Sequence, residues 1–175
     1  MKKIALINDL SGFGNCSLTA AIPVISALGL EACPLPTAIL TAQTGFPGYY
    51  CDDYTDRMDF FTSKWADMGV HFDGICSGYL ASPAQIAKVK SFLNEFQKPD
   101  TLYLMDPVLG DHGRPHPFCT DAFIKGMREL SELATVITPN LTEACLLADI
   151  SYDDLYAHRY EEDYLPRIQD MCITL

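Results

Sequence analysis

The sequence predicts an α/β fold in which a mostly parallel sheet carries helices on both faces. Short apolar runs alternate along the chain with longer amphipathic segments, which is the pattern of strands alternating with helices. The connections are short, as expected of parallel strands joined by crossover helices. The chain has 175 residues, 49% of them hydrophobic, which is enough for one buried core. We therefore expect residues 1–175 to form a single α/β domain.

The chain opens with a predicted buried strand, Lys3–Ile7. Two glycines place a loop after it, and Ser17 or Thr19 is expected to cap a helix that runs to about Leu28. Pro23 lies in the first turns of this helix if the helix starts late, and otherwise it marks a kink.

The next elements follow Gly29. A second strand is expected at about Glu31 to Leu35, with Thr37 to Leu40 continuing extended, and residues 41–51 form a loop that contains glycine and proline. The following segment, Asp52–Met68, is predicted to be an amphipathic helix. Four large apolar residues share its inner face: Met58, Phe61, Trp65 and Met68.

Strands and helices continue to alternate through the rest of the domain. Three further strands are expected at Phe72–Ser77, Thr101–Met105 and Thr135–Ile137. Three further helices are expected at Pro83–Phe96, Asp121–Leu133 and Asn140–Leu147. The first of these helices carries proline in its first turn, where the missing N–H costs nothing.

The last segment has a different character. Tyr152–Asp170 is acidic and rich in tyrosine, and Pro166 breaks it. The chain then ends with Cys172–Leu175, which has the appearance of the start of a further strand.

Charge and cysteine content narrow the function classes. Twelve Lys and Arg against 23 Asp and Glu give a net charge of −11, which argues against a nucleic-acid surface and against electrostatic attachment to a membrane. No apolar run is long enough to span a bilayer. The seven cysteines form no C-x-x-C pair, so we expect no zinc site and mostly reduced thiols in a cytoplasmic protein.

Two blocks of polar residues follow predicted strands. Asp106 to Asp111 comes directly after the run Leu102–Met105, and Thr138 to Glu143 follows the next strand. In open α/β sheets the carboxyl ends of the strands form the edge that binds ligands. Carboxylates at that edge are suited to hold a metal ion and the phosphates that it bridges. The two blocks therefore suggest a phosphate-transfer site.

Five ordered blocks also carry a family resemblance that runs from about residue 3 to about residue 150. Asp-Pro-Val-Leu-Gly-Asp at 106–111 and Thr-Pro-Asn-x-x-Glu-Ala at 138–144 resemble the vitamin kinases of the ribokinase-like superfamily. The blocks at 7–15, 41–46 and 77–80 are similar to pyridoxal/pyridoxamine kinases. The resemblance implies that ATP, with Mg²⁺, phosphorylates the 5′-hydroxymethyl group of pyridoxal, pyridoxamine or pyridoxine.

The resemblance implies three substrate-binding residues. Asp9 occupies a position that faces the ring of the vitamin, where its carboxylate accepts hydrogen bonds. Thr44 is implied as a second contact to the ring, and Tyr79 as a residue that stacks on it. The residues alone leave open a turn-capping aspartate, an ordinary loop threonine and a core tyrosine.

The ATP site implied by the resemblance consists of Asp106, Thr138, Asn140 and Glu143, and its metal ligands are Asp106, Asp111 and Glu143. Two alternatives remain open from the residues alone. The aspartates can cap a helix or form ion pairs, and Asn140 with Glu143 fits a capping box at a helix N-terminus. Family members often carry an aromatic residue where His116 stands, and the role of His116 is left open.

The family's catalytic base lies in a later Gly-Thr-Gly-Asp loop, and this chain has no Gly-x-Gly-Asp sequence. We therefore expect no catalytic residue in this chain, an incomplete ribokinase-like domain, and a chain that is inactive by itself. The expected partners are a B6 vitamer and ATP, with a homodimer in the full-length form. Two alternative functions remain: hydroxymethylpyrimidine kinase of thiamine synthesis, and a non-catalytic binding fragment.

Overall fold

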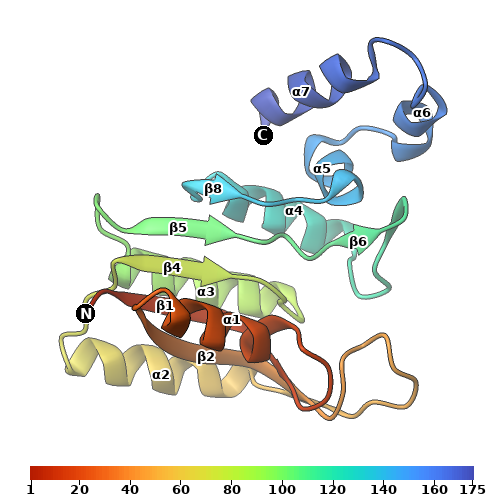
Figure 1. The fold of residues 1–175 in the computed structure, drawn as a ribbon. Helices are drawn as coiled ribbons and strands as arrows, with labels where there is room; N and C mark the ends of the chain where they lie inside the picture. The colour runs from red at the N-terminus through yellow and green to blue at the C-terminus, as the bar shows by residue number, and fades with distance from the viewer.

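The computed structural model describes residues 1–175 and contains one main sheet of six strands with seven helices around it (Figure 1). In spatial order, the strands of this sheet are β3 (Cys51–Asp53), β2 (Glu31–Leu40), β1 (Lys3–Ser11), β4 (Gly74–Ser77), β5 (Leu102–Met105) and β8 (Val136–Ile137). All neighbouring strands pair in parallel except β3, which pairs antiparallel with β2. A separate hairpin is formed by β6 (Gly110–Asp111) and β7 (Arg114–Pro115).

The helices are α1 (Ser17–Ala27), α2 (Thr55–Asp67), α3 (Pro83–Phe96), α4 (Asp121–Ser131), α5 (Leu141–Ala148), α6 (Tyr152–Ala157) and α7 (Tyr164–Thr174). In Figure 1, α1 lies in front of the sheet, whereas α3 and α4 lie behind it. The predicted mostly parallel sheet with helices on both faces is therefore confirmed. Successive side chains of a strand point to opposite sides of the sheet, so every strand contributes residues to both helix-covered faces.

The larger core lies on the face covered by α2, α3 and α4. It combines alternate strand residues such as Ile7, Ile75 and Tyr103 with a group of aromatic side chains. Trp65 contacts Phe72 and Phe92 edge-on, with ring centroids 5.4 and 6.1 Å apart. The alternate residues of the strands point to the other face of the sheet, toward α1, and Leu6 is buried there.

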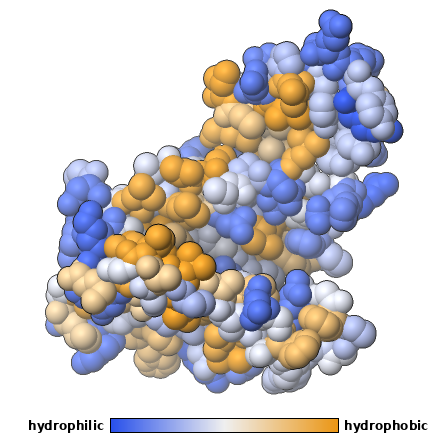
Figure 2. All heavy atoms as spheres, in the orientation of Figure 1, coloured by the Kyte–Doolittle hydropathy of each residue, from blue (hydrophilic) through white to orange (hydrophobic).

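The α1 side of the sheet is covered less completely. In the outer strands, Leu102 of β5 is 47% exposed and Val136 of β8 is 43% exposed. Val24 and Leu28 of α1 are more exposed still. Figure 2, which views this side, shows hydrophobic atoms gathered over α1 and the strands beside it.

Strand β2 tolerates two prolines because most of its outer side is unpaired. Strand β3 pairs only with Ala38, Ile39 and Leu40. Pro34 and Pro36 precede this short pairing, where β2 is an edge strand, and edge positions are where a missing N–H is accepted.

Several expected boundaries in the first half are corrected. Strand β1 continues to Ser11 rather than ending at Ile7, with an irregular register near Asn8. Neither Ser17 nor Thr19 is the N-cap of α1; Cys16 is, although the Thr19 hydroxyl accepts a hydrogen bond from Cys16 N. Pro23 lies inside the helix, so the backbone bond that its nitrogen would make is missing.

Two elements around residue 52 also differ from expectation. Residues 51–53 form the edge strand β3, so the helix predicted from Asp52 begins at Thr55. Strand β4 starts at Gly74 rather than at Phe72, and Phe72 packs instead in the aromatic core. The helix α3 has the predicted bounds, Pro83–Phe96, with Ser82 as its N-cap.

The predicted strand at Cys172–Leu175 is wrong, because Tyr164–Thr174 forms the helix α7. Met171 on its inner side is buried and packs with Cys145 and Leu155 of α5 and α6. Pro166 lies in the first turn of α7, where proline is tolerated, and does not break the segment. The secondary structure of this segment therefore follows the helical spacing of Ile168, Met171 and Leu175, which pack on one side, and not the strand preference of the β-branched residues near its end.

None of the helices has the length and apolar character that crossing a bilayer requires. All seven cysteines are free thiols.

Candidate functional site

The carboxyl ends of the central strands border a cavity of about 280 Å³. Four of the residues singled out in the sequence line it together: Asp9, Thr44, Tyr79 and Asp106. They come from the ends of β1, β4 and β5 and from the loop after β2. The volume is at the lower end of small-molecule sites, which suits a ligand of about one ring.

Asp9 is held near the end of β1 with 6% of its surface exposed. The Ser11 hydroxyl donates to Asp9 Oδ2 over 2.9 Å, and the backbone N–H of Asp9 donates to Asn8 Oδ1 over 3.0 Å. Because β1 continues to Ser11, these residues are part of the sheet and not of a loose loop. A carboxylate with one such partner keeps further lone pairs for a ligand donor.

Tyr79 follows β4 and is fixed through its backbone. Its N–H donates to Asn8 Oδ1 over 2.9 Å, and its carbonyl accepts a hydrogen bond of 2.8 Å from the Thr37 hydroxyl. Its ring lies edge-on to Phe118, with centroids 5.4 Å apart. Burial, with smaller contributions from Cys51 and nearby acids, raises the pKa of Tyr79 to about 12. The phenol therefore remains neutral at physiological pH.

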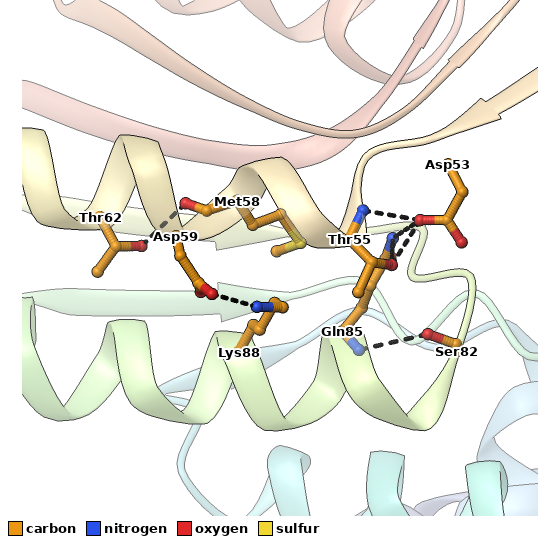
Figure 3. A network of polar contacts seen from close by, with 8 residues as sticks. All are labelled: Asp53, Thr55, Met58, Asp59, Thr62, Ser82, Gln85 and Lys88. Carbon is orange, nitrogen blue, oxygen red and sulfur yellow. Dashed lines mark hydrogen bonds and ion pairs between the residues drawn. The ribbon is translucent and has the colours of Figure 1, made fainter.

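A buried glutamine, Gln85, supports the segment that carries Tyr79, and Figure 3 shows its contacts with Asp53 and Thr55. Gln85 is fully buried in the first turn of α3, and its Oε1 accepts from the backbone N–H of Ala81 over 2.8 Å. Its Nε2 lies within hydrogen-bonding distance of Thr37 O, Asp53 Oδ1 and Thr55 Oγ1. One side chain thus ties α3 to β2, β3 and the start of α2.

Thr44 lies in the exposed loop after β2. This loop is joined to the loop after β1, because Gln43 N donates to Phe13 O over 2.9 Å and the rings of Phe13 and Phe46 lie edge-on, 5.2 Å apart. Gln43 and Thr44 of the loop after β2 line the cavity together with Cys16 and Ser17 at the start of α1.

Asp106 directly follows β5, and its backbone N–H donates to Ser77 O over 2.8 Å. The residue is exposed at the cavity, yet partial desolvation of its carboxyl, and secondly the negative charge of Glu143, raise its pKa to about 6. A cation close to such a carboxylate would favour its charged form and lower this pKa.

Glu143 and Asn140 form the capping box that spacing alone had left open. Asn140 Oδ1 accepts from Glu143 N over 3.0 Å, and Glu143 Oε2 accepts from Asn140 N over 2.8 Å. Glu143 Oε1 also accepts from Leu109 N, and Asn140 Nδ2 donates to Gly110 O. Burial raises the pKa of Glu143, and hydrogen bonds from backbone N–H groups oppose that shift. The pair therefore ties the start of α5 to residues 109–110.

The other predicted residues do not line the cavity. Asp111 is exposed in the β6–β7 hairpin, where its Oδ1 accepts from His112 N over 2.8 Å. Thr138 is exposed after β8, and its N–H donates to Met105 O. His116 stacks on Phe118, with centroids 5.6 Å apart. No group of three or more His, Cys, Asp or Glu side chains is arranged to hold a metal ion.

The sequence reasoning missed several residues that line the cavity: Asn8, Ser11, Cys16, Ser17, Gln43 and Val108. Asn8, Ser11 and Gln43 belong to the blocks at 7–15 and 41–46, and Val108 belongs to the block at 106–111, so the motifs included them without indicating their separate roles. Cys16 and Ser17 lie outside these blocks. For Asn8 the predicted strand end at Ile7 hid the fact that β1 continues past it.

Comparisons with known proteins agree with this arrangement. Residues 13–171 match the family described as phosphomethylpyrimidine kinase. The pyridoxine/pyridoxal/pyridoxamine kinase of Bordetella pertussis is 26% identical over 136 residues, which are 73% of this chain and 47% of that protein. The hydroxymethylpyrimidine/phosphomethylpyrimidine kinase of Mycobacterium leprae is 30% identical over 162 residues, 91% of this chain and 56% of that protein. The chain thus spans about half the length of the curated relatives it matches.

Among solved structures, a candidate phosphomethylpyrimidine kinase from Bacteroides thetaiotaomicron is 43% identical, with a TM-score of 0.86. The similarity covers 97% of this chain and 59% of that one. A second crystal form of that protein, with pyridoxal, has a TM-score of 0.84.

Proposed function

Because the chain belongs to the phosphomethylpyrimidine kinase family of the ribokinase-like superfamily, we propose that it provides the substrate pocket of a B6 vitamer kinase. The reaction of the whole protein is the transfer of the γ-phosphoryl group of ATP to the 5′-hydroxymethyl group of pyridoxal, pyridoxamine or pyridoxine.

The observation that carries this proposal is that acidic residues at the ends of two strands, Asp9 and Asp106, line a cavity large enough for one ring. Asp9 offers hydrogen-bond acceptors, Tyr79 offers an aromatic wall, and Asp106 borders the same cavity. A flat heteroaromatic alcohol fits these groups, since its polar ring atoms meet Asp9 and its faces meet an aromatic side chain. The pyridoxal bound by the Bacteroides relative supports the choice of vitamer.

The residues also fit a magnesium ion, although only loosely. Asp106 is partly desolvated and lies near the charge of Glu143, so a cation there offsets an unfavourable pair. Mg²⁺ commonly uses one or two carboxylates and several waters, which agrees with the lack of a closed ligand cluster. We assign Asp106 as its main ligand, with Asp111 and Glu143 acting through water. When bound with ATP, the ion neutralises charge on the transferred phosphoryl group.

The ATP contacts that we propose are Asp106, Thr138, Asn140 and Glu143. Asn140 and Glu143 hold residues 109–110 against the start of α5, which fixes the segment that follows Asp106. Thr138 lies at the end of β8, bonded through its backbone to the end of β5. These residues therefore position and bind, and none of them is proposed as the catalytic base.

A second candidate is a hydroxymethylpyrimidine kinase. The family match and the Mycobacterium leprae relative favour it, and the amino group of an aminopyrimidine can donate to Asp9 as the phenolic hydroxyl of a B6 vitamer can. The 43% identical relative with pyridoxal favours the B6 vitamers.

Equilibrium titration of the 175-residue chain tests the proposal. We expect pyridoxine to bind more tightly than 4-amino-5-hydroxymethyl-2-methylpyrimidine, and Asp9→Asn to weaken pyridoxine binding. A folded chain that binds neither alcohol would refute both kinase functions. Tighter binding of the pyrimidine would select the second candidate.

A turnover assay tests the role of the chain by itself. We propose that residues 1–175, given ATP, Mg²⁺ and pyridoxal, form no pyridoxal 5′-phosphate above background, because loss of a positioned base typically costs ~10²–10⁴-fold. Steady turnover would place a base within these residues. We further propose a homodimer for the full-length form and the cytoplasm as its compartment, in keeping with the free thiols.

A further inference from the structure

Asn8 occupies the junction between two strand ends that border the cavity. It is in β1, directly before Asp9, and it lines the cavity itself. Its Oδ1 accepts two backbone hydrogen bonds, from Asp9 N over 3.0 Å and from Tyr79 N over 2.9 Å. One amide oxygen thus sets the spacing between the acidic residue and the aromatic residue of the pocket.

These two bonds determine the orientation of the side-chain amide. Both partners of the inner atom are N–H donors, so that atom must be the oxygen, and the other atom is the NH₂ group. Asn8 Nδ2 donates to no group of the protein, and it is not sealed from solvent. An NH₂ group held in a fixed direction at the cavity wall is therefore available to a ligand.

Gly78, the residue before Tyr79, leaves room for the Asn8 amide. A Cβ atom on Gly78 would lie 2.4 Å from Asn8 Nδ2, closer than atoms can approach. Glycine at 78 leaves the space that the amide occupies, and the two bonds to Oδ1 prevent the amide from turning. The wall thus presents a donor, Asn8 Nδ2, beside an acceptor, the Asp9 carboxylate.

We propose that Asn8 is a specificity-determining residue whose NH₂ group donates to an acceptor atom of the ring substrate, while the adjacent Asp9 accepts from a donor atom of the same ring. The inference rests on the proposed function and deepens it. It assigns to the pocket a substrate class with an acceptor and a donor on one heteroaromatic ring, and it excludes rings that carry donors only.

The decisive variant is Asn8→Asp in the 175-residue chain. Its side chain has the same shape and keeps an oxygen for both backbone N–H groups, but it has no NH₂ donor. Asn8→Ala removes both functions. Asn94→Asp, on the exposed surface of α3, is the matched control because it adds the same charge away from the cavity.

We expect Asn8→Asp to remain folded, with a lower thermal midpoint because its new carboxylate lies beside Asp9, and to bind pyridoxine roughly 10- to 100-fold more weakly, since a buried acceptor of the ligand loses its donor. Asn94→Asp should stay within twofold of the parent. The loss should persist between 0.05 and 0.5 M salt, because donor loss is not screened whereas repulsion between exposed charges is.

Two results would overturn the proposal: an unchanged pyridoxine affinity in Asn8→Asp, or a loss of affinity that high salt removes. If the parent chain itself binds no ring alcohol, the proposed function fails instead, so the two failures are distinguishable. The first of these results, combined with a loss of affinity in Asn8→Ala, would show that Asn8 only spaces the strand ends.

Discussion

Replacement of Gln85 by methionine removes the polar centre that joins α3 to β2, β3 and α2 (Figure 3). Methionine has nearly the same length and volume, so it fills the site without a cavity. What it removes, at a fully buried position, is the acceptor of the Ala81 N–H and an NH₂ group whose two hydrogens are shared among three acceptors. The expected loss of stability can be worked out partner by partner.

Three of the four partners keep another hydrogen bond in the variant. The Thr37 carbonyl still accepts from Tyr54 N over 3.0 Å, and Asp53 Oδ1 still accepts from Thr55 N over 2.7 Å. Each of these lost bonds costs about 0.5–1 kcal/mol or less. The N–H of Ala81, in contrast, donates to Gln85 Oε1 alone, and leaving it unpaired costs about 1–3 kcal/mol.

For two donated bonds and one unpaired N–H, the sum is a loss of about 2–5 kcal/mol in the free energy of unfolding. This is a large part of the ~5–15 kcal/mol that domains of this size have. Urea denaturation of the variant and of the parent chain measures it from the two midpoints at equal slope.

Gln97→Met is the matched control, because it makes the same change at the other end of α3. Gln97 Nε2 makes one exposed bond of 3.3 Å to Leu133 O, so its loss should cost less than ~1 kcal/mol. A Gln85→Met variant as stable as the Gln97→Met variant would show that the network does not stabilise the fold.

Three further variants test the remaining parts of the structure. Asp106→Asn should raise the thermal midpoint at pH 8, because the folded pKa of Asp106, about 6, exceeds its ordinary value of ~4 and the carboxylate therefore costs stability above pH 6. This gain should fade as the pH falls toward ~4, and a gain that grows on acidification would contradict the raised pKa. Gly78→Ala should displace the Asn8 amide, cost ~1–3 kcal/mol in urea denaturation and weaken pyridoxine binding, whereas unchanged binding would mean that the amide moves freely. Met171→Ala should cost ~2–5 kcal/mol and the control Ile173→Ala, which is 81% exposed, less than ~0.5 kcal/mol; equal costs would argue against the helix α7.

Elements with strong local signals were predictable from the sequence. The helix α3 begins and ends where the sequence indicated, because a serine cap and a first-turn proline fix its start and six buried residues recur along one face. The buried strand before Asp106 is equally clear, since its apolar run stops at a carboxylate. These signals depend only on neighbours within one or two turns of the chain.

What could not be predicted depends on partners far away in the sequence. The edge strand β3 exists because residues 51–53 pair with β2, and nothing within those three polar residues indicates pairing. The helix α7 depends on Met171 packing against α5 and α6, whereas Ile173 and Thr174 alone favour a strand. The double role of the Asn8 amide likewise needs Tyr79, 71 positions away.

The same dependence on distant partners explains why Asp106 links the two halves of the candidate site. It borders the ring cavity, and the charge of Glu143 contributes to its raised pKa. Glu143 is in turn fixed by the capping box of α5, so the start of α5 contributes, after desolvation, to the raised pKa of Asp106. Phosphoryl transfer requires the alcohol and the phosphate to approach in line within one site. In the proposed function Asp106 would serve both regions, and its position is set by the backbone hydrogen bond from Asp106 N to Ser77 O between β5 and β4.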